Sequence, residues 1–274
     1  MARVPADSPP ICLVIAYHEE GENLLRSLGS VTLEPGDSIV VVDDGSTRLP
    51  ARDLCPDAVA GVPVTLVELA ENQGVAAAAR IGVASAPDDA RYIARLDCRD
   101  VCRADRFRLQ RAYLDAHPRC GIVGSSVDFR ALDGEHLYTH RQPETDAEIR
   151  RLMRVNCAFT QPSVMFRRTA YDAVGGYSES YPYAEDYALF RALMTVSDGY
   201  NLQEPLVVCS TMDGGISQRH RRRQLLTRAK VILTHWDWHP GSAYGLLRAV
   251  AQLATSRNFT SRIKRAVPVL AGRR

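Results

Sequence analysis

Acidic side chains follow three apolar runs of this sequence, and carboxylates grouped in this way can bind a polar ligand. Glu19 comes after the first of these runs, and Asp97 ends the last. Asp43 and Asp44 stop the run between them. The carboxyl ends of neighbouring parallel strands meet at one edge, where open α/β sheets bind their ligands. We therefore expect a ligand site at that edge.

A further acidic pair, Glu185 and Asp186, opens a segment with the spacing of an amphipathic helix. The first turn of a helix holds a carboxylate rigidly and favours its ionised form. An ionised carboxylate in a cleft can take the proton of a hydroxyl group that acts as a nucleophile. The alternative is that the pair only complements the helix dipole.

Two further features suit a nucleotide. Tyr17, close to Glu19, either stacks on a base or packs in the core. Gly74 ends the loop Asn72-Gln73-Gly74, which leads into an alanine-rich helix whose N-terminus favours an anion. Carboxylates nearby can accept hydrogen bonds from a pyrimidine N–H or a ribose hydroxyl.

Other ligand classes are disfavoured by what the sequence lacks. No Gly-x-Gly-x-x-Gly follows the first apolar run, which argues against a dinucleotide dehydrogenase. Cys98 and Cys102 have no second pair nearby, which argues against zinc. A net charge of +2, with no basic stripe interleaved with aromatic residues, argues against nucleic acid.

The elements that position these residues alternate along the chain. Strands are predicted at residues 11–16, 38–42, 64–68, 91–96, 121–129, 163–167 and 206–210. Helices are predicted at 22–30, about 75–84, 105–117, 146–155, 168–174 and 185–196, and the chain is helical and basic from Ser217 onward. This order indicates an α/β fold with a mostly parallel sheet flanked by helices.

The order and spacing of the motifs resemble family 2 of the glycosyltransferases, inverting enzymes that use nucleotide-sugar donors. The resemblance covers roughly residues 9–218. Its landmarks are Ala16-Tyr17-x-Glu19, Val42-Asp43-Asp44-Gly45-Ser46-Thr47, Glu71-Asn72-x-Gly74, Ile93-Ala94-Arg95-Leu96-Asp97, Gln161-Pro162-Ser163-Val164-Met165-Phe166-Arg167, Val174-Gly175-Gly176-Tyr177 and Glu185-Asp186-Tyr187.

This resemblance implies a GT-A fold, a Rossmann-like nucleotide-diphospho-sugar transferase fold, with a C-terminal helical extension. The glycosyltransferase domain would span residues 1–216, with a nucleotide-binding half at about 9–105 and an acceptor half at about 106–216. Residues 217–274 would form the basic helical extension.

The resemblance also implies a donor pocket. In it, Tyr17 stacks on the base, Asp43 or else Asp44 holds uracil or its counterpart, and Glu19 and Asp97 lie near the ribose. The expected donor-binding set is Ala16, Tyr17, Glu19, Asp43, Asp44, Gly74, Arg80, Asp97, Cys98 and Arg99. In the family, the Asp of the Glu185-Asp186 pair is the general base that activates the acceptor hydroxyl. Expected contacts to the diphosphate or the acceptor are Gln161, Gln218, Arg219 and His220.

The usual metal ligands of the family are replaced. The second Asp of its Asp-x-Asp motif is Arg99 here, and Gln161 and Met212 stand where the family often has histidines. Arginine cannot ligate a hard cation, and methionine prefers soft metals. We therefore expect no metal and no cofactor beyond the donor, with Arg99, Arg219 and His220 supplying positive charge to the leaving diphosphate.

Two alternatives to this hypothesis stay open. Catalysis either uses a metal with altered ligands, or has been lost, with Arg99 paired to Asp97 or Asp100. In the second case the chain is a catalytically inactive nucleotide-sugar-binding or scaffold protein.

The resemblance implies transfer from a nucleotide sugar, with UDP the expected nucleotide, to a carbohydrate, lipid-linked or other hydroxyl acceptor in bacterial polysaccharide or glycoconjugate synthesis. The sequence shows no signal peptide and no apolar run long enough to span a bilayer. We expect a cytoplasmic protein, either free or peripheral at the inner face of the cytoplasmic membrane. The aromatic and apolar segment from Trp236 onward would dock on the membrane, pack on the catalytic domain or form a homodimer contact.

Overall fold

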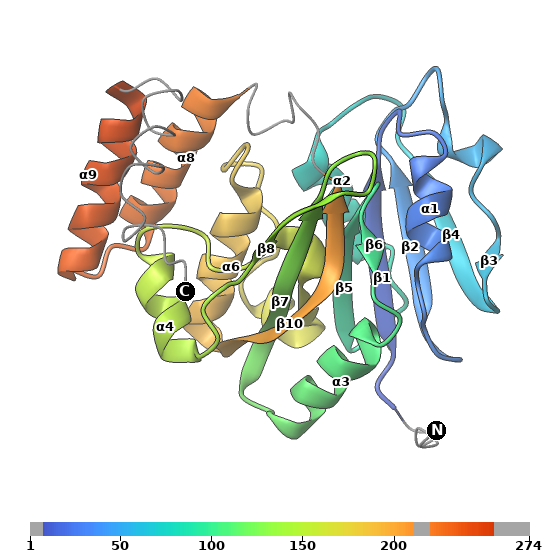
Figure 1. Ribbon diagram of the computed structural model, residues 1–274, viewed down its shortest axis with the longest axis horizontal. Helices are drawn as coiled ribbons and strands as arrows, with labels where there is room; N and C mark the ends of the chain where they lie inside the picture. Colours follow the sequence, from blue (N-terminus) through green and yellow to red (C-terminus); the bar gives the residue numbers. More distant parts are fainter. Residues whose placement is uncertain (1–7, 211–219, 255–274) are drawn as a thin grey trace.

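The computed structural model describes residues 8–210 and 220–254 (Figure 1). A 10-stranded mixed sheet crosses the molecule and has the strand order β3-β4-β2-β1-β5-β9-β7-β10-β6, with β8 paired to β7. The strands are β1 (Ile11–Tyr17), β2 (Ser38–Asp43), β3 (Ala58–Val59), β4 (Val62–Glu68), β5 (Tyr92–Asp97), β6 (Val101–Cys102), β7 (Cys120–Arg130), β8 (His136–His140), β9 (Met165–Arg167) and β10 (Asp198–Ser210).

The first half of the sheet is parallel. Strands β4, β2, β1 and β5 are neighbours in that order and run in the same direction. The apolar runs of β1, β2 and β5 are buried on both faces, which is the usual state of parallel strands covered by helices, whereas β4 is partly exposed. The strands predicted from these runs are confirmed.

The second half contains antiparallel pairings that the sequence did not predict, although strands were expected at residues 163–167 and 206–210. The short strand β9 lies between β5 and β7 and is antiparallel to both. Strand β10 runs parallel to β7 and begins at Asp198, eight residues before its predicted start. Strand β8 was missed because nearly all of it is exposed, so its sequence lacks the apolar pattern of a buried strand.

Helices cover both faces of the sheet. Their bounds are α1 (Asn23–Gly29), α2 (Val75–Ala84), α3 (Arg106–Ala116), α4 (Asp146–Met153), α5 (Arg168–Ala173), α6 (Glu185–Val196), α8 (Arg221–Thr234) and α9 (Pro240–Ala254), with short 3-10 turns at Ala51–Asp53 and Gln161–Ser163. Buried side chains of α1 and α3 share one core cluster, and those of α2, α4, α5, α6 and α8 share the other. The predicted helices are confirmed to within a few residues.

The C-terminal helices are joined to the rest of the fold. Val231 and Ile232 of α8 belong to the same buried cluster as Leu189 and Phe190 of α6. Helix α9 packs against α8 from outside (Figure 1). No helix in residues 8–210 or 220–254 combines the length and apolar character needed to cross a bilayer.

Helix α2 packs closely on the sheet because it carries small residues. A Cβ atom added to Gly82 would lie 2.4 Å from Cγ1 of Val14 in β1. We expect Gly82→Ala to lower the free energy of unfolding by about 1–3 kcal/mol, because overpacking outweighs the better helix propensity of alanine. Urea denaturation measures this difference. Gly29→Ala is the matched control, since a Cβ at that helical position would meet no atom within 4 Å; a loss as large at Gly29 would contradict the packing argument.

Candidate active site

The carboxyl ends of β1, β2 and β5 lie side by side at one edge of the sheet, and the end of β5 lies near the N-terminus of α6. Asp97 ends β5, and Glu185 and Asp186 form the first turn of α6. The charge of Asp97 raises the pKa of both α6 carboxyls, so the three groups lie close enough to interact. The structure therefore brings together acids that are about ninety residues apart in the chain.

Burial shapes the acidity of these three groups. Loss of solvent raises the pKa of Glu185 to about 7, and the neighbouring charges of Asp186 and Asp97 act in the same direction. Burial also raises the pKa of Asp186, although the backbone N–H of Tyr187 opposes the shift at 2.7 Å. The side chain of Asp97 is 42% exposed, and loss of solvent on its buried part raises its pKa as well. Groups whose pKa values are strongly shifted by burial and by neighbouring charges are typical of functional sites.

A fully buried arginine lies beneath the acids. Arg95 of β5 donates from Nη1 to the carbonyl of Val14 at 3.0 Å, and its Nη2 lies 3.7 Å from Oδ1 of Asp97. Its Nε and Nη2 have no hydrogen-bond partner among the described residues. The positive charge of Arg95 lowers the pKa of Asp97 and of Glu185, against the effect of burial. Sequence reasoning missed this residue, although an arginine inside an otherwise apolar strand is a signal for such a role.

Two further groups face the same acids. The hydroxyl of Tyr177 is buried without a hydrogen-bond partner in the described part of the chain, and its pKa is raised by burial. Arg228 of α8 lies close enough to Asp186 for its charge to lower the pKa of that carboxyl. Buried polar groups without partners are rare in proteins, so the floor of the site is suited to a polar ligand.

Tyr17 is a packing residue in this structure, so the expected stacking on a base is corrected. Its side chain is about 1% exposed and belongs to the core cluster under α1. The hydroxyl donates to the carbonyl of Leu49 and accepts from the N–H of Gly21. The ring therefore has no free face for a base.

The acids after β1 and β2 hold loops in place. Asp43 accepts from the N–H groups of Ser46 and Ala51 at 3.0 and 2.7 Å, and it is almost fully buried. Asp44 accepts from the N–H groups of Gln73 and Gly74 at 2.7 and 2.9 Å. Binding of uracil by either carboxylate stays a prediction, and both have these structural partners in addition.

Glu19 has a similar bracing role. Its carboxylate accepts from the backbone N–H groups of Thr47, Arg48 and Leu49, and these bonds lower its pKa to about 2. A permanently ionised Glu19 fixes the turn after β2. Its expected place near a ribose stays a prediction.

Arg99 does not pair with Asp97 or Asp100, which corrects the partners considered from the sequence. Its guanidinium forms an ion pair with Glu20, and its backbone N–H donates to Oγ of Ser27 at 2.9 Å. Its φ of 83° is rare for a residue with a side chain and indicates a position that surrounding contacts impose.

Asp100 lies beside Cys209 and Ser210 instead. Its carboxylate interacts with the thiol of Cys209 at 3.2 Å and accepts from the N–H of Ser210 at 3.3 Å. Burial, reinforced by the charge of Asp97, raises the pKa of Asp100 to about 7. Cys98 is half-buried at the same edge, and burial raises the pKa of its thiol.

The remaining predicted site residues are scattered around this edge. Arg80 forms an ion pair with Glu179 at 3.0 Å, and Gly74 precedes α2 with a φ of 90°. His220 stacks on Tyr183 with ring centroids 4.4 Å apart. Ala16 is half-buried in β1, and Gln161 is half-buried in a 3-10 turn. Gln218, Arg219 and Met212 lie outside the described residues.

The residues present do not form a ready cage for a divalent cation. Within residues 8–210 and 220–254, no three His, Cys, Asp or Glu side chains are grouped as metal ligands. Asp97 is a hard oxygen ligand, but its neighbours Arg95 and Arg99 are cations that ligate no metal.

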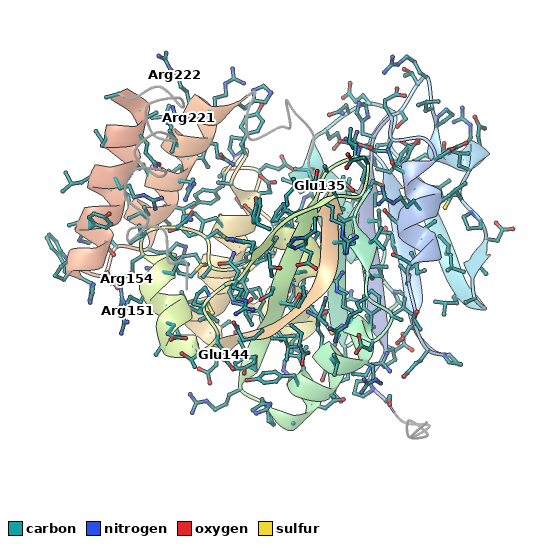
Figure 2. The ribbon with its side chains drawn as sticks, viewed as in Figure 1. Glu135, Glu144, Arg151, Arg154, Arg221 and Arg222 are labelled. Carbon is teal, nitrogen blue, oxygen red and sulfur yellow. The ribbon has the colours of Figure 1, made fainter. Side chains whose placement is uncertain are left out.

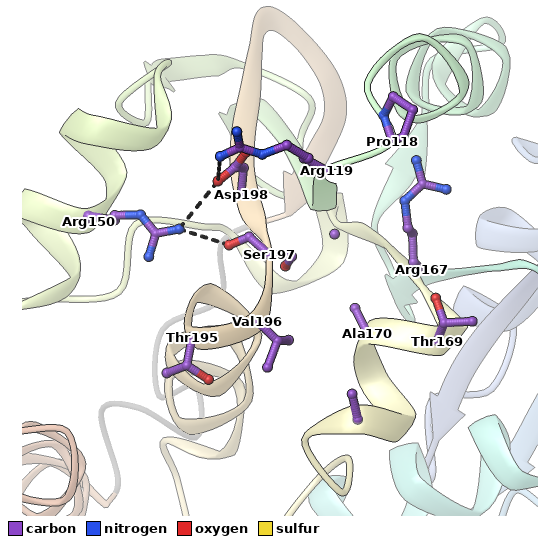
Figure 3. A pocket seen from close by; sticks show the side chains of 12 residues that line it. Pro118, Arg119, Arg150, Arg167, Thr169, Ala170, Thr195, Val196, Ser197 and Asp198 are labelled. Carbon is purple, nitrogen blue, oxygen red and sulfur yellow. Dashed lines mark hydrogen bonds and ion pairs between the residues drawn. The ribbon is translucent and has the colours of Figure 1, made fainter.

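A separate shallow pocket of about 460 Å³ lies away from these acids, at the amino end of β7 and β10 (Figure 3). Its arginines are already engaged: Arg119 and Arg150 pair with Asp198, and Arg167 donates to backbone carbonyls. This pocket brings together no catalytic acids, so the strand-end cluster is the better candidate.

Comparisons with known proteins identify the family and the fold. Residues 12–175 match the model of a family described as Glycosyl transferase family 2. The amylovoran biosynthesis glycosyltransferase AmsE of Erwinia amylovora is 27% identical over 252 residues, which cover 88% of this chain and 92% of AmsE. A UDP-Gal:alpha-D-GlcNAc-diphosphoundecaprenol beta-1,3-galactosyltransferase of Escherichia coli is 25% identical over 208 residues, 73% of this chain and 74% of that protein.

A solved structure has the same fold as this chain. S. aureus TarS 1–349 in complex with UDP-GlcNAc has a TM-score of 0.64 and 15% identity, with 89% of this chain and 71% of that chain covered. At this identity the likeness shows the fold, which is the GT-A glycosyltransferase fold, as expected from the sequence.

The buried charge of Arg95 generates a prediction about pH. The carboxyls of Asp97 and Glu185 have raised pKa values in the folded chain, so the stability that they contribute is present at low pH and is lost as pH rises toward neutrality. Arg95→Met raises both pKa values further, so its destabilisation is larger at pH 8 than at pH 5, by roughly 1 kcal/mol because water screens the partly exposed Asp97. Urea unfolding at both pH values measures it. Arg95→Lys, which keeps the charge, is the control, and equal losses at both pH values would mean that Arg95 only fills space.

Proposed function

This chain belongs to glycosyl transferase family 2 and is a glycosyltransferase, and from that premise we propose that it transfers a sugar with inversion from a UDP-sugar to an acceptor hydroxyl. The observation that carries the proposal is the meeting of Asp97 with the Glu185–Asp186 pair at the strand ends. One side of the site then binds the donor, and the other supplies the base.

Asp186 is assigned the role of general base. Inversion requires attack on the anomeric carbon from the face opposite the leaving group, so the base must lie on the acceptor side. Asp186 takes the hydroxyl proton, the acceptor oxygen bonds to the anomeric carbon, and the bond from that carbon to the diphosphate breaks. The electron pair leaves with the nucleoside diphosphate. Arg228 favours the ionised form of Asp186, because its charge lowers the pKa of that carboxyl against the larger effect of burial.

Glu185 is assigned a supporting role. Its carboxyl is largely buried and has a pKa raised to about 7. Near neutrality it therefore exists in both protonation states. A protonated Glu185 removes one negative charge from beside Asp186 and leaves that carboxylate free to act.

The donor and acceptor classes follow from the relatives. TarS binds UDP-GlcNAc, and the E. coli relative uses UDP-Gal with an acceptor linked to diphosphoundecaprenol. AmsE acts in amylovoran biosynthesis. We assign a UDP-sugar and a lipid-linked acceptor of bacterial polysaccharide or glycoconjugate assembly to this chain.

Arg99 is assigned the charge that the leaving diphosphate requires. Its guanidinium lies at the strand-end edge, with 29% of the side chain exposed. The forked donors of a guanidinium match phosphate oxygens in pairs. In this proposal the diphosphate replaces Glu20 as the partner of Arg99, and no divalent cation takes part.

We expect Asp186→Asn to slow release of UDP from the donor, and transfer to the acceptor, by about 10²–10⁴. Binding of the donor, measured by thermal shift, should not change, because asparagine preserves the shape of the side chain. Asp172→Asn on α5 is the control, since that carboxylate is 62% exposed and only weakly paired. Normal turnover by Asp186→Asn would remove Asp186 from the mechanism, and donor binding without any turnover by the unaltered chain would indicate a binding protein.

We expect EDTA to leave the turnover of the donor unchanged, and Arg99→Ala to slow it by about 10²–10³. Arg103→Ala is the matched control, because Arg103 is a nearby surface arginine paired with Asp105. Loss of activity in EDTA and its recovery with Mn²⁺ would sink the assignment to Arg99.

A further inference from the structure

We propose that α8 and α9 form a docking surface for a bilayer that contains anionic phospholipids. This inference deepens the proposed function, because it rests on a lipid-linked acceptor and gives that acceptor a place of delivery. The docking itself can be tested without any sugar transfer.

The outer face of α9 is apolar. Tyr244, Leu247 and Val250 follow one another at intervals of three residues and are more than half exposed, with Leu247 at 69%. The opposite face buries Gly245 and Ala249. A Cβ at Gly245 would lie 2.3 Å from the carbonyl oxygen of Arg154, so α9 is packed tightly on its inner side. In residues 8–210 and 220–254, nothing covers the outer apolar face, and an apolar helix face of this kind is typical of an interfacial helix.

Neighbouring apolar side chains enlarge this surface. Trp238, in the turn between α8 and α9, is 88% exposed. Leu226 and Leu233 of α8 are seven residues apart, so they share one side of that helix, and both are more than half exposed. Tryptophan is enriched where protein meets the headgroup region of a bilayer.

The charge of the extension favours an anionic surface. Residues 220–254 contain six Lys and Arg against one Asp, whereas residues 8–210 contain 20 Arg against 29 Asp and Glu. The single acid, Asp237, is held by Arg154 at 2.6 Å and by Ser242 at 2.7 Å. Arg222 and Arg223 are exposed at the start of α8, and Figure 2 shows Arg221 and Arg222 at that end of the helix. Each basic residue near an anionic membrane contributes about 1 kcal/mol of attraction.

The same charge disfavours a second copy of this chain as the occupant. Two extensions placed face to face would bring their excess positive charges together. Like charges opposed across an interface cost free energy. A bilayer with acidic headgroups supplies the complementary charge and the apolar interior at once.

The docking surface is fixed to the loop that precedes the catalytic acids. Lys230 of α8 donates to the carbonyl of Ser180 at 3.0 Å, and the hydroxyl of Tyr181 donates to Oγ1 of Thr234 at 3.3 Å. His220 stacks on Tyr183, two residues before Glu185. A membrane bound to α8 and α9 therefore lies beside the acceptor side of the site, where the base is.

The test is co-sedimentation of the full chain with vesicles of phosphatidylcholine alone and with vesicles of phosphatidylcholine and phosphatidylglycerol in equal parts. We expect binding to the mixed vesicles, weakened by salt, and little binding to the neutral ones. Leu247→Ser with Val250→Ser should reduce the binding at least about tenfold, because two apolar side chains no longer enter the bilayer. Arg222→Gln with Arg223→Gln should also weaken it and reduce its dependence on salt.

Leu132→Ser with Leu137→Ser is the matched control, because these two leucines are exposed on the hairpin of β7 and β8, outside the extension. The proposal would be overturned if the Leu132 and Leu137 changes reduced vesicle binding as much as the Leu247 and Val250 changes. Equal binding of the unaltered chain to both kinds of vesicle would also overturn it. So would a dimer in light scattering that the Leu247 and Val250 changes dissociate. Thermal shift with UDP keeps the two proposals separate: failed vesicle binding with intact UDP binding refutes the docking alone, and the reverse result refutes the proposed donor.

Discussion

The candidate site depends on the positive charge of Arg95, whose guanidinium has no access to water. Burying an unpaired charge is costly, and so is collecting carboxylates in a recess. Arg95 and the acids above it lower the free-energy cost of burying one another, because each supplies the opposite charge. Arg106 offers a contrast: it is equally buried, but its donors are used by Gln110 and by backbone carbonyls. In the described part of the chain, Nε and Nη2 of Arg95 have no hydrogen-bond partner, and Nη2 lies 3.7 Å from Oδ1 of Asp97.

Carboxylates serve two purposes at this edge of the sheet. Glu19, Asp43 and Asp44 accept hydrogen bonds from backbone N–H groups of the adjacent loops, so they fix the walls of the site. Asp97 and Asp186 make few such bonds and remain available for chemistry. At this edge a carboxylate braces a loop where backbone donors converge on it, and it can still accept a ligand where they do not.

The parts of the fold that follow from local pattern were predictable, and those that follow from tertiary contact were not. Buried strands such as β1 and β2 could be predicted because nearly all of their residues are apolar. Helix α6 could be predicted because its apolar residues recur at helical spacing. Strand β8 is exposed, so its sequence carries no such pattern. Motif order indicated Asp97 and Asp186 as candidate site residues, and their roles stay predictions. No local signal distinguishes a packing Tyr17 from a stacking one. The effect of Arg228 on the pKa of Asp186 could not be predicted either, because it depends on how α8 packs against α6.

The position of β9 has a consequence for the order of assembly. This strand joins the two halves of the sheet by pairing with β5 on one side and β7 on the other. A ribosome must therefore add about seventy residues after β5 before the edge of β5 can be covered. Pairing between such distant segments is slow, and an open strand edge can recruit other chains in the meantime. The interval between these two strands is where the nascent chain has the greatest need of a chaperone.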